Sequence, residues 1–163
     1  MAGLLAEPLP ALLTQARRAH AKRERLALDA FVVGLFGLSM FKYIGFRHVR
    51  SSGPGATSDL LFDREGFLFR RWQVRCRNSA VLMIDDVAAT LGMLGYCESD
   101  VGVVMCTGEV EFAAAEFAAA ARKSIRQPIV VLDGDALASL AANPRALMGA
   151  VEGRAPEALT LAR

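Results

Sequence analysis

Residues 58–77 of this chain, SDLLFDREGFLFRRWQVRCR, decide the fold. The run predicts two antiparallel strands, 58–63 and 67–77, joined by a tight turn at Arg64-Glu65-Gly66. Alternation along the second strand places Leu68, Trp72, Val74 and Cys76 on one face. We therefore expect a hairpin that buries one face in the core and turns a polar face away from it.

The polar face of the predicted hairpin gathers carboxylates, an amide and guanidinium groups. Asp59 and Asp63 share it on the first strand, and the second strand adds Arg71, Gln73, Arg75 and Arg77. Carboxylate and amide oxygens suit a hard divalent cation, and arginine suits phosphate. The pattern predicts a metal-and-phosphate site. A solvated strand face is the alternative, in which Asp59 only caps a turn.

The composition indicates one folded domain with a slight positive charge. Apolar residues make up 53% of the 163 residues, and the net charge is +2. Basic residues concentrate in the first half, where a dense run contains Arg17, Arg18, Lys22, Arg23 and Arg25. A polyanion should prefer that half. The apolar run 30–41 is too short for a membrane span, which needs about 20 residues, so we expect no membrane contact.

Three cysteines, Cys76, Cys97 and Cys106, each fall in or beside an apolar stretch without Cys-x-x-Cys spacing. We expect buried, reduced thiols in a cytoplasmic protein. The histidines, His20 and His48, lie far apart in sequence, so we expect no zinc site.

The rest of the pattern predicts an α/β fold. Helices are expected over 8–25, 26–43, 84–96, 109–124 and 136–142, and further strands over 46–50, 101–106 and 128–132. Three meandering strands followed by strand–helix–strand crossovers imply a mixed central sheet with helices on both faces. We divide the chain into a basic N-terminal helix (1–25), the α/β domain (26–142) and a C-terminal tail (143–163).

Several short motifs follow one another in a particular order. They are Leu28-Asp29-Ala30-Phe31-Val32, a glycine-rich loop ending in Ser58-Asp59, Trp72-Gln73-Val74-Arg75, the stretch 103–108 with the alanine-rich helix after it, and the stretch 129–134. In this order, residues 26–138 resemble the nuclease domain of Mrr-type (type IV) restriction endonucleases, within the PD-(D/E)xK superfamily. The resemblance implies a restriction-endonuclease-like fold, a DNA substrate, phosphodiester hydrolysis and a role in prokaryotic defence against foreign DNA.

The resemblance also implies roles for single residues. Asp59 corresponds to the metal-binding aspartate, Gln73 to the glutamine that Mrr-type enzymes use where relatives have an acid, and Asp29 to an acidic residue that some members place on the first helix. Mg²⁺ or Mn²⁺ would bind Asp59, the side-chain oxygen of Gln73 and the backbone carbonyl of Val74. We expect this binding mainly with DNA present, because DNA phosphate would complete the coordination shell.

Arg75 departs from the family pattern, which has lysine at this position. Its guanidinium can stabilise developing negative charge on phosphate, but it cannot act as a base at neutral pH. Three hypotheses remain open. The first is a Mg²⁺-dependent DNA endonuclease with Asp59, Gln73, Arg75 and Asp29 as catalytic residues. The second is a catalytically weakened member of the same fold, which binds nucleic acid or serves as a structural subunit. The third is a repair or recombination nuclease with the same site chemistry, which the sequence does not separate from a defence enzyme.

Nucleic acid would contact basic side chains near the strands, namely Arg47, His48, Arg50, Arg71 and Arg77. The alternative for His48 is an ordinary, partly exposed strand histidine. We also expect a homo-oligomer or a subunit of a larger assembly.

Overall fold

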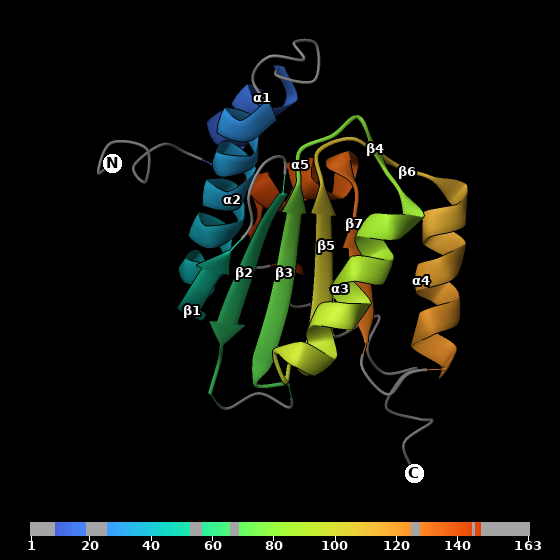
Figure 1. Cartoon of the computed structure of the whole chain (residues 1–163). Helices are drawn as coiled ribbons and strands as arrows, with labels where there is room; N and C mark the ends of the chain where they lie inside the picture. Colours follow the sequence, from blue (N-terminus) through green and yellow to red (C-terminus); the bar gives the residue numbers. More distant parts are fainter. Residues whose placement is uncertain are drawn as a thin grey trace.

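A computed structural model describes residues 9–18, 26–52, 57–65, 69–124, 128–144 and 146–147 (Figure 1). In chain order the elements are α1 (Leu9–Arg18), α2 (Leu26–Tyr43), β1 (Arg47–Ser52), β2 (Thr57–Asp63), β3 (Arg71–Arg77), β4 (Val81–Leu82), α3 (Ile84–Tyr96), β5 (Val101–Cys106), β6 (Glu109–Val110), α4 (Phe112–Ser124), β7 (Ile129–Leu132) and α5 (Gly134–Ala142).

The central sheet is mixed, as the sequence predicts. Its five strands lie in the order β1-β2-β3-β5-β7. The strands β1, β2 and β3 form an antiparallel meander, whereas β3, β5 and β7 run parallel. Parallel neighbours need a crossover, and α3 and α4 supply it between β3 and β5 and between β5 and β7. The predicted α/β fold class is confirmed.

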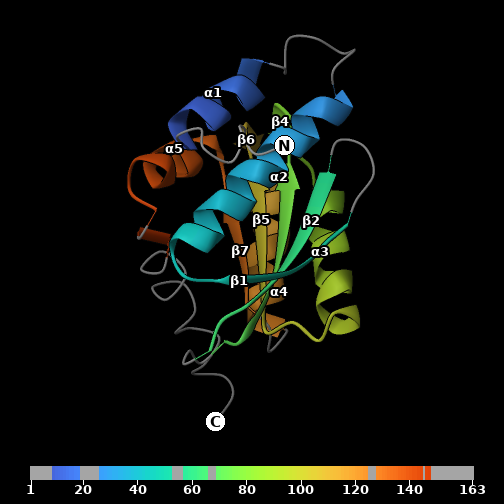
Figure 2. The same cartoon turned by 90° about the vertical axis from the view of Figure 1, so that its left-hand side faces the viewer.

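Helices cover both faces of the sheet (Figures 1 and 2). On one face lie α1, α2 and α5, and on the other lie α3 and α4. The main core fills the first interface and includes Phe41, Phe62 and Trp72, with the rings of Phe41 and Phe62 stacked 4.6 Å apart. A smaller core under α3 and α4 includes Val104 and Ala114. The polar face of the β2–β3 hairpin therefore lies on the same side of the sheet as α3.

Two glycines let α2 lie close to the hairpin. A Cβ at Gly34 would lie 2.7 Å from Ser58 Oγ, and a Cβ at Gly37 would lie 2.7 Å from Cys76 Sγ. Glycine inside a helix costs about 1 kcal/mol relative to alanine, so this close contact explains its presence. The α2 helix thus packs closely on the apolar face of β2 and β3 and fixes the position of the hairpin, whose polar face points the other way.

The start of β3 differs from the sequence prediction. The strand begins at Arg71 rather than residue 67, and the connection from β2 is longer than a tight turn, since the Arg64 N–H donates to the Arg70 carbonyl at 2.8 Å. Asp100 explains this start, because its Oδ2 accepts the backbone N–H groups of Arg70 and Arg71, each at 2.8 Å. Those N–H groups are held by a residue 29 or 30 positions away.

Further boundaries also differ. The helix predicted over 109–124 begins at Phe112, because residues 109–110 form β6, whose Glu109 N–H donates to the Ala80 carbonyl at 2.8 Å. Residues 19–25 of the predicted first helix and most of the predicted tail lie outside the described residues. The division into three parts stays a prediction, although α1 contributes Leu12 and Leu13 to the main core.

Two expectations from composition can be compared with the structure. Cys76, Cys97 and Cys106 are free and buried, as predicted. Burial, with the nearby charge of Asp59 as a smaller cause, raises the pKa of the Cys76 thiol. No helix within the described part of the chain is long and apolar enough to cross a membrane.

Candidate functional site

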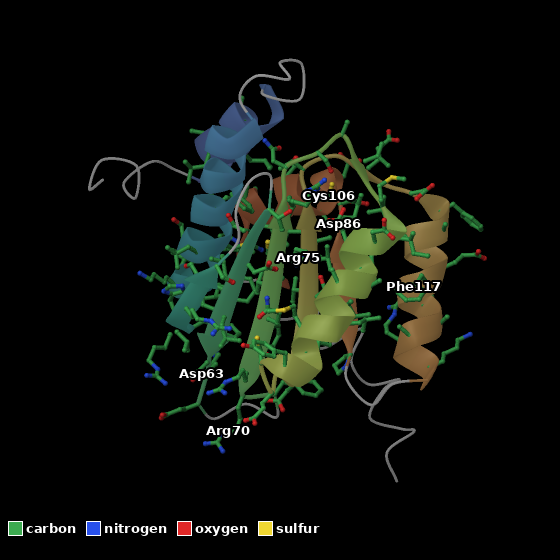
Figure 3. The ribbon with its side chains drawn as sticks, viewed as in Figure 1. Asp63, Arg70, Arg75, Asp86, Cys106 and Phe117 are labelled. Atoms are coloured by element: carbon green, nitrogen blue, oxygen red, sulfur yellow. The ribbon has the colours of Figure 1, made fainter. Side chains whose placement is uncertain are left out.

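The polar face of the β2–β3 hairpin is a ladder of cross-strand pairs. Strand register sets them directly opposite one another: Thr57 and Arg77, Asp59 and Arg75, Leu61 and Gln73, Asp63 and Arg71. Residues paired in this way have neighbouring Cβ atoms, so opposite charges attract and fix the register. Figure 3 places Arg75 and Asp63 at different heights along this half of the sheet.

Asp59 and Arg75 form a two-pronged ion pair. Arg75 Nε donates to Asp59 Oδ1 at 2.8 Å, and Arg75 Nη2 donates to Oδ2 at 3.0 Å. The side chains are only 11% and 14% exposed. Gln73 adds its amide nitrogen, 3.4 Å from Asp59 Oδ1, and is itself buried. The structure therefore brings together three predicted catalytic residues, and their roles stay predictions.

The donors here are of the kind that Mg²⁺ prefers, because Asp59, Gln73 and Val74 would all offer oxygen. Both Asp59 oxygens already accept hydrogen bonds from Arg75, and Gln73 turns its nitrogen toward them. Val74 lies between paired strands, so its carbonyl would offer at most a second lone pair. The described residues contain no group of three or more His, Cys, Asp or Glu that could hold a metal. The donor types thus fit a divalent cation, provided that Arg75 releases Asp59 and the Gln73 amide turns over.

The fourth predicted catalytic residue comes from another layer. Asp29 lies on α2, which packs against the opposite face of the sheet from the ladder. Its side chain is outside the described residues, so its role stays a prediction.

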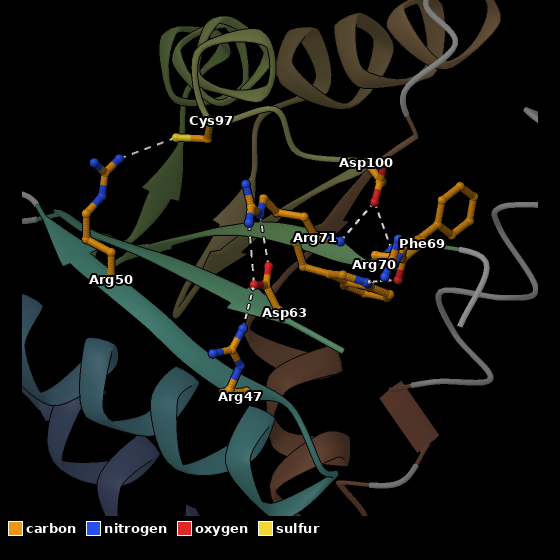
Figure 4. A network of polar contacts seen from close by, with 9 residues as sticks. Arg47, Arg50, Asp63, Phe69, Arg70, Arg71, Cys97 and Asp100 are labelled. Atoms are coloured by element: carbon orange, nitrogen blue, oxygen red, sulfur yellow. Dashed lines mark hydrogen bonds and ion pairs between the residues drawn. The ribbon is translucent and has the colours of Figure 1, made fainter. Parts of the chain in front are cut away.

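A second ion pair lies at the other end of the ladder (Figure 4). Asp63 Oδ1 accepts from Arg71 Nε at 2.9 Å, and Asp63 Oδ2 accepts from Arg47 Nη2 at 3.1 Å. The hydrogen bond from Arg71 is the main cause that lowers the pKa of Asp63, burial opposes it, and the charges of Arg71 and Arg47 assist it. The same hydrogen bond raises the pKa of Arg71. The Asp63 and Arg71 side chains are 20% and 37% exposed.

The predicted nucleic-acid contacts do not form one patch. Arg47 and Arg71 meet at Asp63, whereas Arg77 lies six residues along β3, about 20 Å away at strand geometry. There Arg77 Nη1 donates to Thr57 Oγ1 at 2.9 Å, and Arg77 Nε lies 3.6 Å from Asp86 Oδ2.

The two remaining predicted contacts lie on β1. His48 Nε2 is hydrogen-bonded to Ser51 Oγ at 2.8 Å, and Arg50 is exposed and donates to Cys97 Sγ at 3.6 Å. Arg50 borders a hollow of about 440 Å³, also lined by Val49, Leu61, Arg71, Tyr96, Cys97 and Glu98. The hollow shares the sheet face with Asp59, because Leu61 and Arg71 belong to the ladder. None of the five predicted contacts is tested by this geometry.

Sequence reasoning missed several polar contacts at the ends of the strands that carry the site. Asp86, in the first turn of α3, anchors Arg77. Thr107 Oγ1 donates to Asn78 Oδ1 at 2.6 Å in a buried contact. A signal for this last pair was present, because the two residues directly follow β5 and β3, and parallel strands end at one edge of a sheet.

A comparison with known protein families identifies the family of this chain. A family model described as a restriction endonuclease, Mrr_cat, matches residues 20–141. No curated protein and no solved structure matches the chain. The family match covers most of the chain, including the entire ladder, and it confirms the resemblance seen in the sequence. The chain belongs to the Mrr_cat family of restriction endonucleases.

Proposed function

We propose that this domain hydrolyses DNA phosphodiester bonds as a divalent-cation-dependent endonuclease. The observation that carries the proposal is the convergence of Asp59, Gln73 and Arg75 on one sheet face. Asp59 and Gln73 would hold Mg²⁺ or Mn²⁺, with the Val74 carbonyl as a further donor. When bound, the cation would stabilise charge on the phosphate and lower the pKa of the attacking water.

Arg75 would change partners when DNA binds. Its guanidinium fork bonds two carboxylate oxygens in the free protein, and the same fork matches two phosphate oxygens. A DNA phosphate that takes over Arg75 would leave the oxygens of Asp59 free. DNA and cation would then strengthen each other's binding, by thermodynamic linkage. A guanidinium group only donates hydrogen bonds, so Arg75 would stabilise the phosphate and accept no proton.

The hollow beside the ladder supports the proposal that DNA reaches the site from this face of the sheet. Exposed Arg50 lies at its rim, and Arg71 lines it within the ladder that holds Asp59. Contacts from exposed arginines to phosphate position a duplex without reading its sequence. We also propose a role in defence against foreign DNA, and the match to a restriction-endonuclease family supports this. A reducing compartment such as the cytoplasm is supported by three free cysteines.

A supercoiled plasmid tests the proposal. The wild-type protein should nick it with Mg²⁺ or Mn²⁺, and Asp59→Asn should abolish nicking. Asp63→Asn is the matched control, because it removes a second aspartate paired with arginine on the same face, and it should keep the activity. Equal nicking by Asp59→Asn and wild type would contradict the assignment.

A second candidate is a non-catalytic member of the family that binds nucleic acid or supports a larger assembly. One specific observation favours it, which is that Arg75 occupies both oxygens of an aspartate only 9% exposed. Salt-sensitive DNA binding without nicking in any metal would support this candidate. If the Arg75→Lys variant then nicked DNA, the fold of the site would be intact and the arginine at position 75 would be the cause of the missing activity.

A further inference from the structure

An apolar patch is exposed where the α3 and α4 helices begin. Val81, Met83, Ile84 and Phe112 are exposed, and Phe112 most of all, at 75%. The β4–β6 ribbon brings them together, because the Glu111 N–H donates to the Leu82 carbonyl at 3.1 Å and the packed helices α3 and α4 start at Ile84 and Phe112. Clustered exposed apolar side chains mark interaction surfaces more often than single ones do.

Carboxylates surround this patch. Glu109 lies directly opposite Val81 in the ribbon, and Asp85 and Glu111 each adjoin a patch residue in sequence. A neighbouring hollow of about 580 Å³ is lined by Glu109, Asp133 and Asp135, with Thr107, Gly108, Val110 and Gly134. Asp133 Oδ1 accepts the Ala136 N–H and so caps α5, and the side chains of Glu109, Asp133 and Asp135 are all exposed. We call the four apolar residues and these five acids the acidic end.

The acidic end has a chemical complement in this chain. Its carboxylates would repel DNA and attract a cationic segment. Residues 17–25, RRAHAKRER, carry Arg17, Arg18, Lys22, Arg23 and Arg25, whose aliphatic stems can cover exposed apolar side chains while their charged ends meet the carboxylates. The α1 helix and the β4–β6 ribbon lie at the same end of the molecule (Figures 1 and 2).

We propose that the acidic end binds the basic segment, residues 17–25, of a second copy of this chain. Because α1, which leads into the segment, and the β4–β6 ribbon lie at one end of each molecule, two copies related by a two-fold axis can exchange segments reciprocally. Each exchange pairs opposite charges around exposed apolar side chains, and the two-fold axis doubles the contact. This proposal does not depend on nuclease activity.

A charge swap, read by light scattering during size exclusion, tests the exchange. One variant reverses the segment (Lys22→Glu, Arg23→Glu and Arg25→Glu), and the other reverses the acidic end (Asp85→Lys, Glu109→Lys, Glu111→Lys and Asp135→Lys) while keeping Asp133, which caps α5. Wild type should dimerise at low salt and dissociate as salt is added. Each variant alone should dimerise at least about tenfold more weakly. An equimolar mixture should restore a mixed dimer, because each segment again faces an opposite charge.

Two further variants complete the test. Arg122→Glu with Lys123→Glu reverses two cations in the last turn of α4, away from the acidic end, and should leave dimerisation unchanged. Phe112→Ser should weaken the dimer at least about tenfold with no change in the unfolding transition, since the side chain is exposed. A monomer at every protein concentration in low salt, or a mixture that stays monomeric, would overturn the proposal. So would a dimer unaffected by the acidic-end variants.

Discussion

Two aspartate–arginine pairs on the same sheet face differ in ways that separate a candidate site from a surface ion pair. Both cross from β2 to β3, and both have Nε–Oδ1 distances of 2.8–2.9 Å. The Asp59–Arg75 pair is nearly enclosed and has the Gln73 amide beside it. The Asp63–Arg71 pair is more exposed and includes a second arginine, Arg47. The distances within an ion pair therefore do not identify a site by themselves. Burial and the neighbouring Gln73 amide distinguish the Asp59–Arg75 pair from the Asp63–Arg71 pair.

The charge balance of the two pairs also differs. Asp63 is shared by two guanidinium groups, which together hold its pKa below the usual range. Both hydrogen bonds that Asp59 accepts from an arginine come from Arg75. If Arg75 moves to a phosphate, Asp59 loses its cation, whereas Asp63 would keep Arg47 on losing Arg71. We therefore propose that the Asp59–Arg75 pair, and not the Asp63–Arg71 pair, exchanges its arginine for a metal ion, and Asp63 serves as the control.

The largest expected contrast between the pairs is in stability. Asp59→Ala should lower the free energy of unfolding by about 2–3 kcal/mol, because it leaves the enclosed guanidinium of Arg75 without its partner. Asp63→Ala should lower it by less than about 1 kcal/mol, because its partners are more exposed. Urea denaturation followed by circular dichroism measures both. Equal losses would mean that enclosure does not distinguish the pairs.

A smaller contrast is expected when the guanidinium fork is removed but its charge is kept. Arg75→Lys should lower the free energy of unfolding by about 1 kcal/mol, since lysine cannot bond both oxygens of Asp59 in a fixed geometry. The same variant should nick plasmid DNA faster than wild type. Arg71→Lys is the control for stability and should change the free energy of unfolding by about 0.5 kcal/mol or less. A loss of nicking in Arg75→Lys, with the protein folded, would argue against a lysine-like role at this position.

Acid titration should show the contribution of Asp63 to stability, which we expect to be less than about 1 kcal/mol. A carboxyl whose folded pKa is lowered stabilises the protein above its unfolded pKa, about 3.9 for aspartate. That contribution disappears as the pH falls from about 4 toward the lowered folded pKa. Asp63→Asn should therefore lose stability less steeply than wild type below about pH 4. Parallel curves of unfolding midpoint against pH would show that Asp63 contributes nothing.

The smallest expected effect concerns Glu98, which lines the hollow beside Arg71. Glu98 has φ of 50°, a left-handed conformation that favours glycine after a helix, and its charge helps to raise the pKa of Arg71. Glu98→Gly should stabilise the fold by about 0.5 kcal/mol, as relief of strain outweighs the lost attraction. Thermal unfolding measures this, and a lower melting temperature would show that the attraction to Arg71 dominates.

Local patterns account for what the sequence predicted well. The bounds of α2, α3 and β5 agree with the prediction, because long apolar runs and helical periodicity are local signals. Alternation alone placed Asp59, Gln73 and Arg75 on one face. The strand register that places Asp59 opposite Arg75 depends on the length of the connection between β2 and β3. The predicted tight turn was too short, because β2 ends at Asp63 and β3 begins at Arg71.

Long-range contacts account for what was missed. Asp100 sets the start of β3 from a distant loop, and Asp86 anchors Arg77 from a helix. The β4–β6 ribbon has only two residues in each strand, too few for a visible alternation. The burial of Asp59 likewise results from the packing of helices and strands that are distant in sequence, so the residues next to Asp59 do not reveal it.

The coupling between DNA and cation tests the central claim most directly, because it follows from Arg75 exchanging Asp59 for phosphate and needs no turnover. Calorimetric titration with Mn²⁺, with and without a short DNA duplex, measures it in wild type, Asp59→Asn and Asp63→Asn. DNA should tighten Mn²⁺ binding at least about fivefold in wild type and in Asp63→Asn, and should have no such effect in Asp59→Asn. Equal Mn²⁺ affinity with and without DNA in wild type, or an undiminished DNA effect in Asp59→Asn, would contradict the account.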